Sequence, residues 1–204
     1  MMSLNRIQGD WYDGVIPSNV ELGVNAHIDT SYGLALIDST RRPCLIMAAG
    51  SGSYTTSFVI GPNGRVTVGS CTCLNSPFLI CQESITIGSH CLVSWGAVIT
   101  DTDLGQRESR GTNQQMLRRA AADPDRRLAP LTRPLPVIIE DAVWIGFGSV
   151  VMPGVTVGRG SVIGCKTVVD QDIPPYVVVA GNPLRVVREL DPPGRDQSPG
   201  VVPG

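Results

Sequence analysis

The chain has 204 residues, of which 42% are hydrophobic, 17% are charged and 5% are aromatic. This composition predicts one folded domain with a sizeable core and excludes a disordered chain. The formal net charge of -2 provides no basic field for nucleic acid or an acidic membrane surface. No apolar run approaches the ~20 residues that a membrane span requires, and the amino terminus lacks the pattern of a leader. We therefore expect a cytoplasmic protein that binds neither nucleic acid nor membrane.

The first periodic signal begins near residue 20. Apolar residues recur six positions apart in three places: Leu22 and Ile28, Val68 and Leu74, and Ile87, Val93 and Ile99. A glycine directly follows the first residue of each set, and the spacing fits neither a helix nor a simple alternating strand. Near Leu34 to Thr56 the spacing is interrupted by "IDSTRRPCLIMAAGSGS". We expect this segment to cover or extend one end of the repeat.

A second interruption, the excursion, runs from Leu104 to about Pro136. Its stretch "NQQMLRRAAADPDRRL" contains good helix formers before the pair Asp123 and Pro124, so we expect a helix that stops there. Seven of the sixteen basic residues lie in the excursion: Arg107, Arg110, Arg118, Arg119, Arg126, Arg127 and Arg133. Two interpretations stay open, namely a cationic lid for an anionic ligand such as a CoA or carrier-protein phosphate, or a solvated helix.

The strongest repeat begins at Val137 and reads "VIIEDAVWIGFGSVVMPGVTVGRGSVIGCKTVV". Its apolar residues recur at every sixth position: Ile139, Ile145, Val151, Val157, Ile163 and Val169. Hexapeptide repetition predicts an all-β fold, a parallel β-helix in which three units close a triangular coil and the aliphatic side chains stack inward. We expect this domain to span residues 1–190, including the excursion at about 104–136. The Pro- and Gly-rich residues 191–204 form an expected disordered tail.

The six cysteines are Cys44, Cys71, Cys73, Cys81, Cys91 and Cys165. None forms a C-x-x-C pair and most lie in apolar stretches, so we expect reduced, buried thiols that fill the core.

The segment from Val137 to Leu190, including the exit "IPPYVVVAGNP", resembles the carboxy-terminal signature of the hexapeptide-repeat acyltransferases. This superfamily has a left-handed parallel β-helix and includes maltose, serine, xenobiotic and sugar acetyltransferases. The looser repeats extend the resemblance over most of the chain. It implies a homotrimer in which acyl-CoA lies between neighbouring coils. A small hydroxyl or amine acceptor, or an acyl carrier, is the implied second partner.

The resemblance also implies a set of cofactor-binding residues. Trp144 and Gly146 would lie beside the pantetheine arm of the cofactor. Gly164 would allow the amides of that arm to approach the protein backbone. Lys166 and Arg185 would lie near the CoA phosphates. Lys166 is the only lysine in the sequence. The alternative is that Trp144 caps the coil and that the two cations are solvated surface residues.

In the superfamily a histidine on the excursion removes the acceptor's proton as the acceptor attacks the thioester, and a backbone amide holds the developing oxyanion. In many sugar-modifying relatives this histidine follows an acidic stretch resembling "TDTDFH". Here "TDTD", residues 100–103, is followed by Leu104 and Gly105, so Gly105 occupies the histidine's place. We therefore expect weak or absent ordinary acetyl transfer.

Other residues remain candidate bases. We expect His27 to point outward, where it either faces a neighbouring chain or serves packing, and His90 to lie in an exposed turn. Asp101 and Asp103 would act as a base if burial raised a pKa, or they are ordinary turn residues.

Two histidines are too few for the three-histidine metal site of a γ-class carbonic anhydrase, which shares the coil, so we expect no metal. A second hypothesis for function stays open. It is a β-helix protein without acyl transfer, either a scaffold or binding protein or a pocket recruited to other chemistry.

Overall fold

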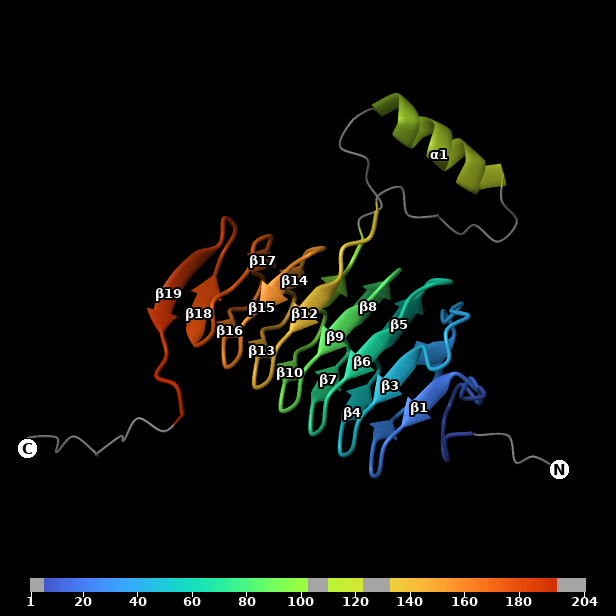
Figure 1. The fold of residues 1–204 in the computed structure, drawn as a ribbon. Helices are drawn as coiled ribbons and strands as arrows, with labels where there is room; N and C mark the ends of the chain where they lie inside the picture. The colour runs from blue at the N-terminus through green and yellow to red at the C-terminus, as the bar shows by residue number, and fades with distance from the viewer. Residues whose placement is uncertain (1–5, 103–109, 123–132, 194–204) are drawn as a thin grey trace, which may run out of the picture.

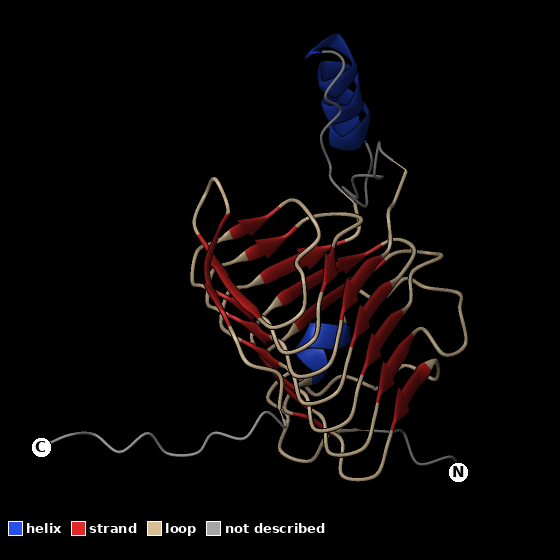
Figure 2. Ribbon diagram, turned by 60° about the vertical axis from the view of Figure 1, so that its left-hand side comes forward, coloured by secondary structure: helices blue, strands red, loops and turns tan. Residues whose placement is uncertain are grey.

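The computed structural model describes residues 6–102, 110–122 and 133–193. The chain winds in successive triangular coils, and the strands of these coils stack into three flat sheets (Figure 1). Figure 2 shows the molecule rotated about the vertical axis, with the stacked strands joined by loops and the helix of the excursion apart from them. This is the all-β, left-handed parallel β-helix that the repeat and the resemblance predicted.

The three sheets run the length of the coil. Sheet A contains β1 (Val20–Leu22), β3 (Leu45–Met47), β6 (Val66–Val68), β9 (Ile85–Ile87), β12 (Val137–Ile139) and β15 (Thr156–Val157). Sheet B contains β2 (His27–Ile28), β4 (Gly52–Tyr54), β7 (Cys73–Asn75), β10 (Leu92–Val93), β13 (Trp144–Ile145), β16 (Val162–Ile163), β18 (Val177–Ala180) and β19 (Arg185–Glu189). Sheet C contains β5 (Ser57–Ile60), β8 (Phe78–Cys81), β11 (Val98–Thr100), β14 (Val150–Val151) and β17 (Val168–Val169). Neighbouring strands are parallel except β19, which returns antiparallel along β18.

The register stacks equivalent residues of successive coils on one another. Ile145 pairs with Val93 on one side and with Ile163 on the other, and all three are 0% exposed. β-branched side chains suit these short strands because they fill the pleated inner surface with few rotamers to lose. Burying each such side chain stabilises the fold by about 1.5–3 kcal/mol. The six-residue spacing is thus the spacing of one face of the triangle.

The glycines that follow the inward aliphatic residues are required by the next coil. A Cβ at Gly146 would lie 2.7 Å from the backbone nitrogen of Cys165, and one at Gly158 would lie even closer to that of Pro175. Neither glycine has a positive φ, so it is close approach rather than turn conformation that demands glycine. Packing between coils also explains the small residue that precedes each outward strand position. Ser149, for example, is buried and donates its hydroxyl to the carbonyl of Gly164 at 2.8 Å.

The prediction that the repeat is interrupted near Leu34 to Thr56 is largely wrong. It contains β3 and β4, which form regular strands of sheets A and B. The 3-10 helix η1 (Ser31–Leu34) and the loop after it, up to Pro43, depart from regular strands, although Ile37 still pairs parallel with Ile60 of β5. The repeat is hidden because the inward position of β4 is the buried polar residue Ser53, and because the next inward residue, Phe58, follows after five positions.

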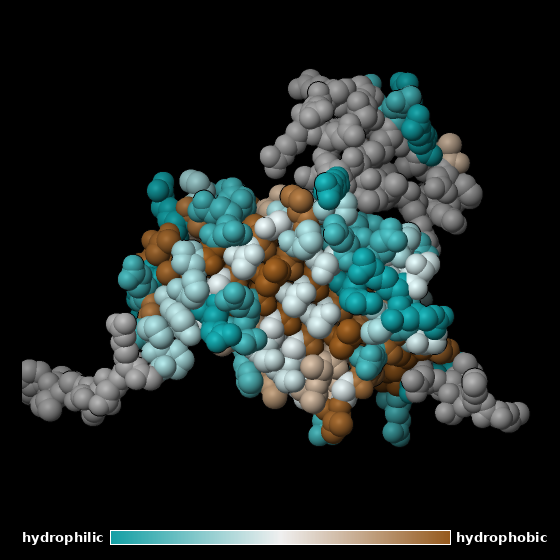
Figure 3. Space-filling model, viewed as in Figure 1, coloured by the Kyte–Doolittle hydropathy of each residue, from teal (hydrophilic) through white to brown (hydrophobic). Residues whose placement is uncertain are grey.

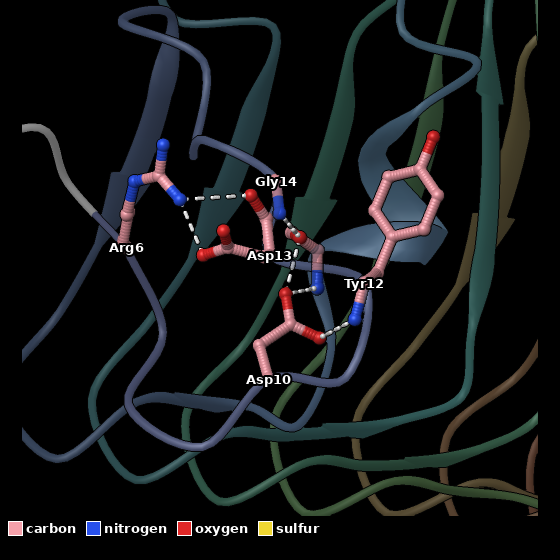
Figure 4. A network of polar contacts seen from close by, with 6 residues as sticks. Arg6, Asp10, Tyr12, Asp13 and Gly14 are labelled. Carbon is pink, nitrogen blue, oxygen red and sulfur yellow. Dashed lines mark hydrogen bonds and ion pairs between the residues drawn. The ribbon is translucent and has the colours of Figure 1, made fainter.

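The N-terminal segment covers the first coil, where Ile7 and Ile16 pack against the core. The Asp10 carboxylate fastens it. It accepts a hydrogen bond from the backbone nitrogen of Tyr12 at 3.1 Å (Figure 4). It also accepts from the Thr30 hydroxyl at 2.8 Å, from the backbone nitrogen of Ser31 at 2.9 Å and from the Ser31 hydroxyl.

The excursion contains α1 (Arg110–Ala122), as its helix-forming residues predicted. The described basic side chains Arg118, Arg119 and Arg133 are exposed. Arg107, Arg126, Arg127 and the expected stop at Asp123 and Pro124 lie outside the described residues, as do residues 194–204 of the expected tail. No helix in the described ranges has the length and apolar character to cross a membrane.

All six cysteines are free, but the expectation of buried thiols is only half correct. Cys44, Cys81 and Cys91 are buried, whereas Cys71 and Cys165 are exposed and Cys73 is partly exposed. Cys71 lies at a corner with a φ of 55°, and Cys73 occupies an outward position of β7. Position within the six-residue unit, not the apolar neighbourhood, decides burial.

Candidate functional site

Sheet B brings together the residues that the resemblance assigned to acyl-CoA. Gly146 follows β13, and its amide donates to the carbonyl of Ile163 at 2.8 Å. Gly164 occupies the same place in the next coil, and its amide donates to the carbonyl of Val179 at 2.7 Å. Ala180 follows in turn and pairs with Arg185 of β19. Gly146, Gly164 and Ala180 therefore form a strip without bulky side chains, the small-residue strip, which ends beside Arg185.

Trp144 lies at the edge of the small-residue strip. Its side chain is half-exposed, and its indole N–H donates to the Ser94 hydroxyl at 3.3 Å. Ser94 occupies in the preceding coil the place that Gly146 occupies in its own, because the Ser94 amide donates to the carbonyl of Ile145. The hydrogen bond therefore holds the indole ring across the start of the strip. Sequence reasoning did not single out Ser94, because its partner lies fifty residues away.

Lys166 lies at the corner beyond the small-residue strip, in the left-handed conformation with a φ of 55°. Its Nζ lies 5.9 Å from the centroid of the exposed Phe147 ring, within reach of a cation–π interaction. Lys166 and Arg185 are both exposed, and within the described ranges no carboxylate forms a salt bridge with either. The two cations are therefore free to meet an anionic ligand.

Asp101 is fully buried rather than exposed at a turn. Its carboxylate accepts hydrogen bonds from three consecutive backbone nitrogens, those of Gln82, Glu83 and Ser84. Burial and the nearby charge of Asp101 raise the pKa of the Cys81 thiol, and burial also raises the pKa of Cys91. These thiols are protonated at neutral pH and are not nucleophiles. Asp103 and Gly105 lie outside the described residues.

Neither histidine belongs to the small-residue strip. His27 is exposed on β2, and its ring centroid is 5.6 Å from that of Tyr54. β2 lies four strands from β13 in sheet B, which at ~4.8 Å per strand separates His27 from Trp144 by roughly 19 Å. His90 is exposed at a corner with a φ of 60°, as expected. Within one chain His27 does not reach the strip, whereas His90 lies at the corner before β10, the strand that pairs with β13. Among the described residues no three His, Cys, Asp or Glu side chains form a cluster suited to a metal ion.

Comparison with known proteins places Gly146 and Gly164 of the strip in a matched region. Residues 136–171 match the family model for the bacterial transferase hexapeptide (six repeats). The galactoside O-acetyltransferase of Escherichia coli K12 is 54% identical over 56 residues, which make up 28% of this chain and 28% of that protein. The aligned part of this chain thus spans less than a third of that relative.

Solved structures resemble a larger part of the chain. A hexapeptide-repeat acetyltransferase of Vibrio cholerae O1, complexed with acetyl coenzyme A, is 29% identical with a TM-score of 0.53, covering 71% of this chain and 73% of that one. A galactoside acetyltransferase in complex with coenzyme A is 26% identical with a TM-score of 0.52, covering 70% and 64%. Residues 136–171 thus carry the bacterial transferase hexapeptide repeat, and the coil as a whole is similar to those of solved hexapeptide-repeat acetyltransferases.

Proposed function

We propose that the protein is an acyl-CoA-dependent acyltransferase-like protein that acts on a small hydroxyl or amine acceptor. One observation carries the proposal: the matched repeat at residues 136–171 contains Trp144, Gly146, Gly164 and Lys166, which the coil stacks on one side of sheet B. The acetyltransferases that share this coil are crystallised with acetyl coenzyme A or coenzyme A.

The strip suits an extended pantetheine arm because Gly164 and Ala180 are partly exposed and carry no bulky side chain, while Gly146 is buried beneath the next coil. In the proposal the arm lies beside Trp144 and Gly146, and Gly164 allows its amides to approach the backbone. Lys166 and Arg185 bind the CoA phosphates at the far end, since cationic side chains form charge-assisted hydrogen bonds with phosphate oxygens. A homotrimer supplies the second wall from a neighbouring coil.

In acyl transfer the acceptor's oxygen or nitrogen attacks the thioester carbonyl, the C–S bond breaks, the CoA thiolate leaves and a base takes the acceptor's proton. With Gly105 in the place of the loop histidine, the ordinary base is missing in this proposal. Base assistance contributes ~10²- to 10⁴-fold, so transfer is slow unless another group supplies it. The remaining candidates are Asp103, and His27 acting on a neighbouring chain.

Calorimetry with acetyl-CoA and longer acyl-CoAs tests the cofactor site on the intact protein. We expect binding that weakens in Lys166→Ala and Arg185→Ala. Arg159→Ala is the matched control, because Arg159 pairs with Asp141 at another corner of the coil. No binding at millimolar acyl-CoA would exclude the proposal.

Installing the missing base is the second test. We expect Gly105→His to raise acetyl transfer to a panel of sugars and amines. If the parent protein already transfers acetyl groups at ordinary enzymatic rates and Gly105→His changes nothing, the base is elsewhere.

A second candidate function is a β-helix scaffold or binding protein without acyl transfer. Gly105 favours it, together with the exposed position of His27, roughly 19 Å from Trp144 along sheet B. Assay of thioester hydrolysis or transfer by the purified protein separates the two functions. Robust turnover that disappears in Asp103→Asn or His27→Ala contradicts the scaffold.

A further inference from the structure

One buried carboxylate lies at the point where the excursion leaves the coil. Asp101 follows β11 directly and is 0% exposed. Its two carboxylate oxygens accept from Gln82 N at 2.8 Å and 3.0 Å, from Glu83 N at 2.7 Å and from Ser84 N at 2.9 Å. These amides belong to the corner between β8 and β9, one coil earlier.

The backbone of the same residue holds the point where the excursion returns. The Asp101 carbonyl accepts from Leu135 N at 2.8 Å, and the Asp101 amide donates to Ile80 O at 3.1 Å. The Leu135 carbonyl in turn accepts from Gly154 N at 3.0 Å, in the following coil. Asp101 and Leu135, which we call the neck, therefore tie three successive coils together beside β11 and β12.

The contacts of Asp101 fit an anchor better than a proton acceptor. A general base needs a lone pair that a reacting group can reach, but this carboxylate accepts from three backbone N–H groups and the residue is closed to solvent. Backbone amides hydrogen-bond the carboxylate, and without it three partly buried donors lose their acceptor. An ordinary turn residue accepts fewer hydrogen bonds. Asp172, for example, accepts only from Thr156 N, at 2.7 Å and in an exposed place.

We infer that Asp101 is a positioning residue for acyl transfer. Its ionised carboxylate fixes where the excursion leaves and rejoins the coil, and it thereby sets where the residues of the excursion stand relative to the small-residue strip. The inference rests on the proposed function in so far as the strip is the acyl-CoA site.

Amide hydrogen exchange on the full chain tests the neck without any assay of activity. In Asp101→Asn we expect the amides of residues 82–84 and 135 to exchange roughly tenfold faster or more, while inward residues such as Ile145 and Ile163 keep their protection. Asp172→Asn is the matched control and leaves those four amides unchanged. Unchanged exchange in Asp101→Asn overturns the inference.

The wild-type protein provides a second test if Asp101→Asn does not fold. The four amides should be protected, and they should lose protection together as denaturant is added at low concentration. Fast exchange of all four at neutral pH, or release of residues 82–84 while 135 stays protected, contradicts the neck.

Kinetics separates positioning from acid–base catalysis. For a positioning residue, Asp101→Asn lowers kcat and leaves both the KM for acyl-CoA and the shape of the pH profile unchanged. If the acidic limb of the profile disappears instead, Asp101 is a base and the inference is wrong. A wild-type protein without transfer activity would count against the proposed function alone, because hydrogen exchange still decides the role of Asp101.

Discussion

Asp10 shows how one side chain can fasten a whole segment. Burial opposes its ionisation, but hydrogen bonds from the hydroxyl and amide of Ser31, the hydroxyl of Thr30 and the amide of Tyr12 outweigh that effect. The pKa of the carboxyl therefore lies well below its usual range. A group with a lowered pKa in the folded state stabilises that state at pH values above its unfolded pKa, about 3.9 for Asp. This stabilisation is lost as the pH falls from about 4 toward the folded pKa.

We accordingly expect Asp10→Asn to melt below the wild type at pH 7, and the difference in Tm to narrow steadily below about pH 4. Thermal unfolding, monitored by circular dichroism across this pH range, measures the difference in Tm between the two proteins. Asp13→Asn is the control, because Asp13 pairs with Arg6 on the exposed surface, where ion pairs contribute little. A difference in Tm that is the same at pH 7 and pH 3 would count against this role of Asp10.

Substitution of two glycines of the repeat provides a second prediction at the scale of single residues. Gly158→Ala would press its Cβ against the backbone of Pro174 and Pro175, so we expect a loss of ~1–3 kcal/mol in the free energy of unfolding. Gly164→Ala should cost less, because its nearest neighbour is the Ala180 side chain, 3.0 Å from the added carbon. Urea unfolding of both variants checks the order. Equal losses would show that close approach of the next coil does not select glycine.

Single elements explain what the sequence could and could not predict. The strands from β12 onward were predictable because inward residues such as Ile145, Val151 and Ile163 keep a strict six-residue step and are aliphatic. β4 was missed because Ser53 is polar and the following step has five residues. The anchor role of Asp101 left no side-chain signature, since its partners are backbone amides 17 to 19 residues earlier. The residues around Trp144 came from the resemblance, and only the register shows that they adjoin one another.

Strand β12 offers a matched pair of substitutions. Ile139 is 1% exposed and stacks between Ile87 and Val157, whereas Ile138 is 44% exposed on the outer surface. We expect Ile139→Ala to cost ~2–5 kcal/mol of unfolding free energy and Ile138→Ala to change it by no more than ~0.5 kcal/mol. Chemical denaturation measures both. Comparable losses would mean that the strand does not alternate between core and surface.

At the scale of the whole molecule, the outer faces of the three sheets differ. Figure 3 shows brown, apolar residues among white and teal ones over the body of the coil. The register assigns the outward residues of each sheet, and in sheet B, which carries the small-residue strip, they are Leu92, Trp144, Val162 and Val178. Sheet C carries Phe78, Val98, Val150 and Val168 in one row, and sheet A carries Thr67, Thr86, Ile138 and Thr156. An apolar outer face on a solenoid is a surface that another copy can bury. Sheet C, not sheet A, is therefore the face that the proposed homotrimer would cover.

Sedimentation of the intact protein tests this assembly. We expect wild-type protein to sediment with the mass of three chains at micromolar concentration. Val150→Asp should yield single chains, because a carboxylate placed in a buried apolar contact has no partner. Thr86→Asp, on the exposed surface of β9, is the matched control and should leave the mass unchanged while both variants keep the circular dichroism of the coil. If the wild type sediments as a single chain, the homotrimer is wrong; if Thr86→Asp dissociates it as readily as Val150→Asp, sheet C is not the face that the copies share.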